Sequence, residues 1–203
     1  MFKNGSIMSG LLIGLAGWIF CSVGGGLLGS ILFSLGLLSV VYFGSFLYTG
    51  KAGSYKFRPL RLFSDIGGLG MILVGNIIGC LIIALIAKES GTINEETISG
   101  IISSRERNDA FQTLFRSIGC GFLMELAVWS WRSKGSVLGV LLCVPAFILS
   151  GFYHSVADAF YYLVSYDKLG IWVLWIYPIT VIGNFIGCSI RRVFYGNSEE
   201  SNK

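Results

Sequence analysis

The chain has 203 residues, of which 54% are apolar and only 13% are charged, and its mean hydropathy is +0.73. Soluble domains carry about 25% charged residues, so this composition excludes a water-soluble globular fold. The net charge of +4 is too small and too dispersed for a nucleic-acid-binding protein.

Long apolar runs predict an all-α membrane protein with six transmembrane helices, because roughly 20 apolar residues are needed to cross a bilayer core. The first run has no charged residue, and we expect it to form two helices joined by a turn at Gly24, Gly25 and Gly26. The fifth predicted span, 137–164, is interrupted around residues 151–155. The runs are 7–48, 66–87, 115–131, 137–164 and 171–190.

Basic residues concentrate in the loops on one side of these predicted spans, which indicates the cytoplasmic side. We therefore expect a multi-pass protein of the plasma (inner) membrane with both termini in the cytoplasm. A signal peptide is the alternative for the N-terminus, but the apolar run is too long for one and lacks a cleavage site. The basic residues assigned to the cytoplasmic side are Lys3, Lys51, Lys56, Arg58, Arg61, Arg132, Lys134, Arg191, Arg192 and Lys203.

The string Gly75-Asn76-Ile77-Ile78-Gly79-Cys80 recurs as Gly183-Asn184-Phe185-Ile186-Gly187-Cys188. The third span runs outward and the sixth inward, so this pattern predicts inverted repeats over about 7–87 and 114–190. Such repeats are typical of channels and transporters, whose solute path lies between the halves. An alternative is that both strings, with Asn76 and Asn184, serve only helix packing. We expect one channel domain over 1–203, with an extramembrane loop 88–113 and a cytoplasmic tail 191–203.

Polar residues break the second span near residues 46–50 and the fifth near residues 152–155. Unwound backbone at membrane depth is tolerated where protein or a water-filled cavity satisfies it, so both breaks indicate a pore. The only histidine, His154, lies in the second break and can exchange protons with a weak acid, although a buried structural histidine is the alternative.

Two acidic residues lie inside apolar sequence, where an uncompensated charge is costly. Asp158 either orients His154 from one helical turn away or faces a neighbouring subunit. Glu125 needs a partner. The five cysteines form no metal or disulfide pattern, so we expect no metal site and no cofactor.

The chain resembles the formate/nitrite transporter family from about Gly10 to Arg192. The strings that carry the resemblance are Ser150-Gly151-Phe152-Tyr153-His154-Ser155-Val156-Ala157 and Pro178-Ile179-Thr180-Val181-Ile182-Gly183-Asn184-Phe185-Ile186-Gly187, with Leu47-Tyr48-Thr49-Gly50 earlier. The resemblance implies an aquaporin-like inverted repeat with broken second and fifth helices, in a homo-oligomer of five subunits embedded in the lipid bilayer.

The resemblance also implies roles for individual residues. His154 is the central pore histidine, which exchanges protons, and Thr49 faces it. The outer hydrophobic constriction consists of Phe33, Met124 and Phe147, and the inner one of Leu37 and Leu47. Arg105 matches a basic position of the outer vestibule. Several residues depart from the family pattern and are candidate modifiers of selectivity: Gly121, Glu125, Asp158, Lys51 and Tyr153. For Gly121 we expect a wider or more hydrated opening.

The leading function is a channel or proton-coupled transporter for small monovalent weak-acid anions of the formate, nitrite or hydrosulfide class. An apolar constriction penalises a bare anion, so the solute passes more easily as the neutral conjugate acid. One alternative keeps the fold but conducts a neutral or cationic solute such as ammonia, because of Glu125 and Asp158. The remote alternative is an intramembrane enzyme, which we reject because no other catalytic group accompanies His154 and Asp158.

Overall fold

The computed structural model describes residues 5–53 and 62–195. Within these ranges the chain is helical and contains no β-strand. Five of the residues used to predict the orientation, Lys3, Lys56, Arg58, Arg61 and Lys203, lie outside the described ranges.

The N-terminal half forms two long apolar helices, α1 (Ser6–Ser22) and α2 (Gly26–Tyr42), a short helix α3 (Tyr48–Ala52) and the long helix α4 (Leu62–Ser90). The turn between α1 and α2 lies at the predicted glycines. Gly24, Gly25 and Gly26 have φ angles of 81°, 72° and 64°, a region that residues with a Cβ rarely adopt.

The segment predicted as an extramembrane loop contains a helix that the hydropathy pattern does not reveal, α5 (Glu95–Glu106). Its N-cap, Asn94, accepts a hydrogen bond from the backbone N–H of Thr97. The first turn holds Glu95 and Glu96 and the last turn holds Arg105, so the charges complement the helix dipole.

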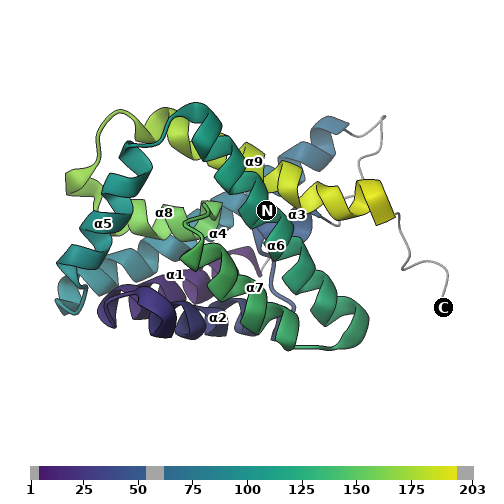
Figure 1. The fold of residues 1–203 in the computed structure, drawn as a ribbon, viewed down its shortest axis with the longest axis horizontal. Helices are drawn as coiled ribbons and strands as arrows, with labels where there is room; N and C mark the ends of the chain where they lie inside the picture. The colour runs from purple at the N-terminus through teal and green to yellow at the C-terminus, as the bar shows by residue number, and fades with distance from the viewer. Residues whose placement is uncertain (1–4, 54–61, 196–203) are drawn as a thin grey trace.

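The C-terminal half repeats the order of the first half. It comprises α6 (Ala110–Lys134), α7 (Leu138–Leu149), the shorter α8 (Ser155–Val164), a 3₁₀ turn η2 (Tyr166–Lys168) and α9 (Val173–Tyr195). Figure 1 shows α5 at one end of the molecule and the last turns of α9 toward the other end, with α8 and α3 between them.

Equivalent helices of the two halves make equivalent contacts. Helix α1 packs on α4 and α2, and correspondingly α6 packs on α9 and α7. Each short helix packs against a long helix of the other half: α8 packs on α4, and α3 packs on α9. The two halves therefore meet around the short helices.

Glycines allow the long helices of each half to cross closely. A Cβ on Gly79 would lie 2.2 Å from the carbonyl oxygen of Ile7, and one on Gly187 would lie 2.1 Å from that of Ile118. The two repeated strings thus form the contact surfaces α4–α1 and α9–α6, as the packing hypothesis for these strings expects.

Two described segments are long and apolar enough to cross a membrane on their own, Ile66–Ser90 in α4 and Val173–Tyr195 in α9. Helices α1, α2 and α7 are apolar but shorter. Helix length and composition alone therefore do not establish six spans.

Candidate functional site

His154 and Thr49 meet at the centre of the molecule, where the two short helices approach each other. Thr49 lies in α3 and is fully buried, and His154 is the N-cap of α8 and is 2% exposed. The Nε2 atom of His154 lies 3.1 Å from the Oγ1 atom of Thr49. The structure thus brings together two residues that are 105 positions apart in the chain.

The hydrogen bonds of His154 define its tautomer. Its Nδ1 atom accepts the backbone N–H of Ala157 at 3.1 Å, so the proton of the neutral ring lies on Nε2. Nε2 therefore donates to Thr49 Oγ1. A second proton at Nδ1 would displace the hydrogen bond from Ala157, which caps α8.

Asn184 holds the backbone on which His154 lies. Its side-chain carbonyl accepts the N–H of Ser155 at 2.8 Å, and its amide donates to the carbonyls of Tyr153 at 2.7 Å and Ser117 at 2.9 Å. The peptide groups on both sides of His154 are thereby fixed.

Asn76 holds the equivalent backbone before Thr49. Its side chain accepts the N–H of Tyr48 at 2.9 Å and donates to the carbonyls of Phe46 at 2.9 Å and Ser6 at 2.7 Å. The repeated asparagines predicted from the sequence therefore satisfy the backbone of the segments that precede the two short helices.

Two buried thiols add equivalent contacts. Cys188 lies 3.3 Å from the carbonyl oxygen of Thr49, and Cys80 lies 3.4 Å from that of Val156 in α8. Each thiol connects a long helix of one half to the short helix of the other half. All five cysteines are free.

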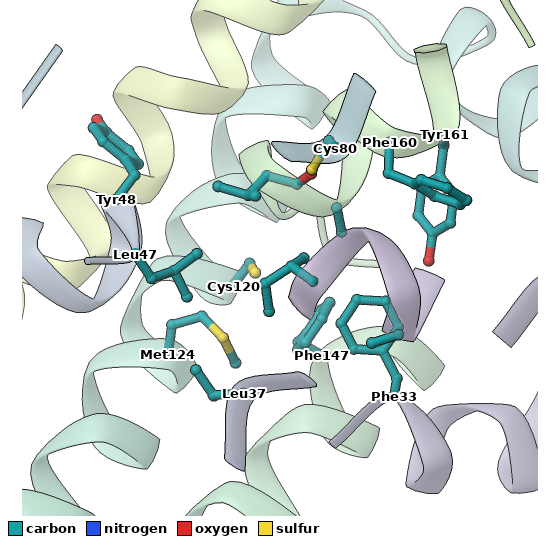
Figure 2. Packing of buried hydrophobic residues seen from close by; sticks show 14 of the residues in the cluster. Phe33, Leu37, Leu47, Tyr48, Cys80, Cys120, Met124, Phe147, Phe160 and Tyr161 are labelled. Atoms are coloured by element: carbon teal, nitrogen blue, oxygen red, sulfur yellow. The ribbon is translucent and has the colours of Figure 1, made fainter. Parts of the chain in front are cut away.

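An apolar cluster lies next to the His154–Thr49 pair. The rings of Phe33 and Phe147 meet edge to face, with their centroids 6.1 Å apart, and the Phe147 ring lies 5.7 Å from that of His154. Figure 2 shows Met124, Leu37 and Leu47 together with Phe33 and Phe147 among the buried apolar side chains of the core. All five predicted constriction residues are buried: Phe33, Leu37, Leu47, Met124 and Phe147.

A cavity of about 70 Å³ lies on one side of this cluster, lined by His154, Asp158, Arg105 and neighbouring apolar residues. A wider opening of about 500 Å³ begins where Phe20, Ile101 and Arg105 line both spaces. Together these spaces form a vestibule beneath α5, which we call the outer vestibule.

Arg105 and Asp158 form a buried ion pair in the outer vestibule. Both the Nη2 and the Nε of Arg105 donate to the same carboxylate oxygen, Oδ1, at 2.9 Å and 3.3 Å. The guanidinium also lies 4.4 Å from the centroid of the Tyr153 ring. Burial lowers the pKa of Arg105, but the charge and hydrogen bonds of Asp158 together with Tyr162 and Tyr153 outweigh this effect, so the pKa is raised.

Asp158 therefore makes neither of the two contacts considered from the sequence. Its side chain binds Arg105 of α5 and does not orient the His154 ring, which Ala157 and Thr49 hold instead. The sequence pattern does not indicate this pairing, because Arg105 lies in the segment that was treated as a loop.

Tyr153, fully buried, links the break before α8 to the end of α5. Its hydroxyl donates to the carbonyl of Ser104 at 3.2 Å and accepts a hydrogen bond from the side chain of Asn108. Its ring supports Arg105, so Tyr153 acts on the vestibule through the position of that guanidinium.

A second cavity of about 190 Å³ lies on the other side of the apolar cluster, and we call it the inner vestibule. Leu47, Gly50, Lys51 and Arg132 are among the residues that line it. The Nζ of Lys51 lies 4.6 Å from the Phe46 ring centroid, and Arg132 donates to the carbonyl of Gly50 at 2.6 Å. Arg132 is thus a site residue that sequence reasoning used only for orientation.

Glu125, which needs a partner inside the apolar helix α6, finds one in α9. The Nε of Arg191 donates to Glu125 Oε1 at 2.8 Å. A Cβ on Gly53 would lie 1.9 Å from Glu125 Oε2, so the carboxylate packs directly against the end of α3. The same end is held by a hydrogen bond from Arg192 to the Gly53 carbonyl.

Gly121 lies in the contact between α6 and α9. A Cβ at this position would lie 2.3 Å from the carbonyl oxygen of Asn184. This geometry is the counterpart of Gly10, whose Cβ would lie 2.0 Å from the carbonyl oxygen of Asn76. The expectation of a wider opening at Gly121 is therefore wrong, because the glycine accommodates a helix backbone.

Comparisons with known proteins agree with this arrangement. A family model described as "Formate/nitrite transporter" matches residues 3–195. Two similar relatives are "Uncharacterized transporter YrhG" of Bacillus subtilis (strain 168), 30% identical over 149 residues, and "Formate channel BtFdhC" of Bacillus thuringiensis, 28% identical over 147 residues. Each alignment covers 66% of this chain, and 55% and 56% of the respective relative.

The chain thus spans about half the length of the curated relatives it matches. Among solved structures, one described as "Pentameric formate channel with formate bound" is similar with a TM-score of 0.79 and 21% sequence identity. That likeness covers 91% of both chains and concerns the fold.

Proposed function

The chain belongs to the formate/nitrite transporter family, a family of transporters and channels rather than enzymes, and we propose that it conducts small weak acids across the plasma (inner) membrane. The substrates are small monovalent anions of the formate, nitrite or hydrosulfide class, or their conjugate acids. The observation that carries the proposal is the His154–Thr49 contact, which lies next to a buried apolar cluster with a vestibule on either side.

The path runs from the outer vestibule, past the apolar cluster and the His154–Thr49 pair, to the inner vestibule. Cationic side chains line both ends, Arg105 outside and Lys51 with Arg132 inside. Lys51 and Arg132 attract anions toward the inner entrance, whereas the charge of Arg105 is balanced by Asp158. The apolar cluster opposes a bare charge, because an ion in an apolar surrounding loses its hydration without compensation.

The vestibules admit an anion that the apolar cluster excludes, and we expect the solute to lose its charge near His154. A weak-acid anion that gains a proton in the vestibule becomes a small neutral molecule, which passes Phe33, Phe147 and Leu47 at lower cost. His154 offers a hydrogen bond from Nε2, shared with Thr49, and exchanges protons with the solute either directly or through water.

The membrane arrangement in this proposal has six spans. Helices α2 and α3 together form the second span and α7 and α8 the fifth, so both spans are broken, and the halves are inverted repeats of one channel domain. Large apolar side chains on the outer surface, such as Leu28, Leu142 and Phe115, face lipid or neighbouring subunits. The protein is a homopentamer, which is how the solved structure with the similar fold is described.

Both termini are cytoplasmic in this arrangement, which places α5 and the outer vestibule outside. Thiol labelling of intact cells tests this topology with Arg107→Cys, in the turn between α5 and α6, and Lys134→Cys, at the far end of α6. An impermeant maleimide is expected to modify position 107 and not position 134, and the reverse pattern would invert the proposed orientation.

The direct test is flux into proteoliposomes that contain a pH-sensitive dye, with formate, nitrite, hydrosulfide, lactate and chloride as competing solutes. Uptake of formate, nitrite or hydrosulfide above the protein-free background, rising as external pH falls, supports the proposal. The variant His154→Asn is expected to lose most flux and to change its pH profile. Parent vesicles no more permeable than empty ones would refute the proposed function.

The ammonia alternative loses its main support at Asp158 and Glu125. Each carboxylate is paired with an arginine, Arg105 or Arg191, so neither presents an uncompensated negative charge that would favour a cation.

A further inference from the structure

The outer vestibule narrows where its wide opening of about 500 Å³ meets the cavity of about 70 Å³ that reaches His154. The residues that line both spaces are Phe20 of α1 and Ile101 and Arg105 of α5. Each keeps some accessible surface, since Phe20 is 7% exposed, Arg105 is 9% exposed and Ile101 is half-buried. A solute that moves from the opening to the cavity therefore passes between these three side chains.

The ring of Phe20 is closely packed on the side of α2. A Cβ on Gly29 would lie 2.9 Å from the Cδ2 atom of Phe20, and one on Gly25 would lie 3.2 Å from its Cζ atom. The ring also meets that of Tyr161 in α8, with the centroids 6.4 Å apart. Phe20 thus rests on two glycines and has little room to move toward α2 and away from the passage.

Hydrogen bonds at both ends of α5 fix the opposite wall of the passage. The backbone N–H of Asn94, the N-cap of α5, donates to the carbonyl of Cys21, the residue after Phe20, at 3.3 Å. In the last turn of α5, Arg105 donates to Asp158 at 2.9 Å. Helix α5 is therefore held at a set distance from the end of α1.

Phe20 also extends the aromatic cluster outward. Its ring meets that of Phe33 edge to face, with the centroids 6.4 Å apart, and Phe33 meets Phe147 in the same way. Phe147 lies beside His154. A solute that enters from outside consequently meets Phe20 before it reaches the predicted outer constriction.

The chemistry of the passage favours selection by size. Phe20 and Ile101 offer no side-chain hydrogen bond, and the charge of Arg105 is balanced by Asp158. A water molecule occupies about 30 Å³ in the liquid, so the cavity of about 70 Å³ behind the passage accommodates a solute of only a few non-hydrogen atoms. Formate, nitrite and hydrosulfide meet this limit, whereas lactate carries a hydroxyethyl group in addition to its carboxylate.

We propose that Phe20 and Ile101 form a size filter at the entrance of the channel, which admits solutes of the size of formate and excludes larger monocarboxylates such as lactate. The inference rests on the proposed function and narrows its substrate class. Neither residue is among the constriction residues expected from the sequence, because Phe20 lies in a long apolar run and Ile101 in the segment treated as a loop.

Formate and lactate are the probes for this filter, because their conjugate acids have similar strength and differ mainly in size. Uptake of each labelled solute into proteoliposomes is measured at the same external pH. The parent should take up formate at least about tenfold faster than lactate, the discrimination that an apolar pocket achieves for small differences in size. Phe20→Ala widens the passage, so the ratio of lactate to formate uptake should rise by about tenfold. Ile101→Ala should raise it several-fold.

The matched control is Ile13→Ala, since Ile13 is a buried apolar residue of the same helix as Phe20 and lines neither space of the outer vestibule. This variant should keep the parent ratio of lactate to formate uptake. Gly29→Ala tests the opposite direction, because the new methyl group displaces the Phe20 ring toward the passage. Formate uptake should fall several-fold in Gly29→Ala and recover in the double variant Gly29→Ala with Phe20→Ala.

The outcomes separate the filter from the proposed function. If the parent conducts none of formate, nitrite and hydrosulfide, the proposed function itself fails. If the parent takes up lactate as fast as formate, or if Phe20→Ala and Ile101→Ala both keep the parent ratio, the size filter is wrong and the channel stands. Should Phe20→Ala not assemble, Ile101→Ala decides, because Ile101 lies in α5, outside the proposed spans, and an unchanged ratio in this variant overturns the filter.

Discussion

Asn76 and Asn184 make the same three hydrogen bonds in the two halves of the chain. Each accepts the N–H of the residue that begins a short helix, Tyr48 or Ser155, and donates to the carbonyl two residues earlier, Phe46 or Tyr153. Each also donates to a long helix of its own half. The asparagines thus replace backbone hydrogen bonds that the interrupted helices lack.

Replacement of either asparagine by alanine is expected to destabilise the protein. Each change removes three hydrogen bonds and leaves buried backbone groups without partners, a loss of about 3 kcal/mol. The apparent melting temperature in detergent, followed by loss of the oligomer peak in size-exclusion chromatography, should fall for both variants. Formate flux should fall as well, because His154 and Thr49 lie directly beside the freed peptides.

The control is Ser189→Ala, since Ser189 is a polar residue of the same helix, half-buried where Asn184 is fully buried, and it donates only within α9, to Phe185. It should change the stability by less than about 0.5 kcal/mol. An Asn184→Ala variant as stable as Ser189→Ala would contradict the structural role assigned to the repeated asparagine.

Thr49→Val tests the hydroxyl that faces the histidine. The substitution keeps the shape of the side chain but leaves the Nε2–H group of His154 without its acceptor, so the ring loses its orientation. We expect formate uptake to fall at least tenfold, whereas Thr49→Ser, which keeps the hydroxyl, should stay within about threefold of the parent. Equal fluxes for the valine and serine variants would show that the hydroxyl does not matter. The tenfold loss corresponds to about 1.4 kcal/mol, the size of one hydrogen bond.

The repeat and the central histidine could be predicted from the sequence because their signals are local. The two Gly-Asn-x-x-Gly-Cys strings are short and nearly identical, and His154 stands out in an apolar segment. The family assignment, made from the string around His154 and the final repeat, is confirmed by the family model that matches residues 3–195.

Charge pairs over long distances could not be predicted in the same way. Arg105 and Asp158 are 53 residues apart, and Arg191 and Glu125 are 66 apart, so no periodicity connects them. Helix α5 is only weakly amphipathic, and the sequence features that indicate it are its N-cap and its terminal charges. A search for long apolar runs does not detect such features. The error at Gly121 has a related cause, because a family comparison by position does not show which face of α6 meets α9.

The surroundings of Gly187, in the close crossing of α6 and α9, and of Gly67 in α4 predict opposite effects for two Gly→Ala substitutions. At Gly187 a Cβ would lie 2.1 Å from the carbonyl of Ile118, so the helices must separate, at a cost of about 2 kcal/mol. At Gly67 in α4 a Cβ would have no neighbour within 4 Å, so Gly67→Ala should stabilise the helix by about 0.5 kcal/mol. Melting temperatures of the two variants in one detergent test this contrast. A Gly187→Ala variant no less stable than the parent would refute the crossing.

The loss of one partner of the Glu125–Arg191 ion pair is expected to destabilise the protein by more than the attraction within the pair stabilises it. Glu125 is 1% exposed and Arg191 13%, so removal of one charge strands the other in an apolar surrounding. Glu125→Gln should therefore destabilise the protein by about 3 kcal/mol and reduce flux, because the carboxylate packs against α3, which carries Thr49. The control Glu89→Gln removes an exposed carboxylate at the end of α4 and should change stability by less than about 0.5 kcal/mol.

The double variant Glu125→Leu with Arg191→Met separates the two contributions. It removes both charges and keeps apolar volume in the contact between α6 and α9, so its melting temperature should return close to that of the parent. If the double variant is more stable than either single variant, the two substitutions are coupled, and the charges of Glu125 and Arg191 compensate each other. If the effects of Glu125→Leu and Arg191→Met simply add, each side chain acts through separate partners, and Arg191 is not the group that keeps Glu125 charged beside α3.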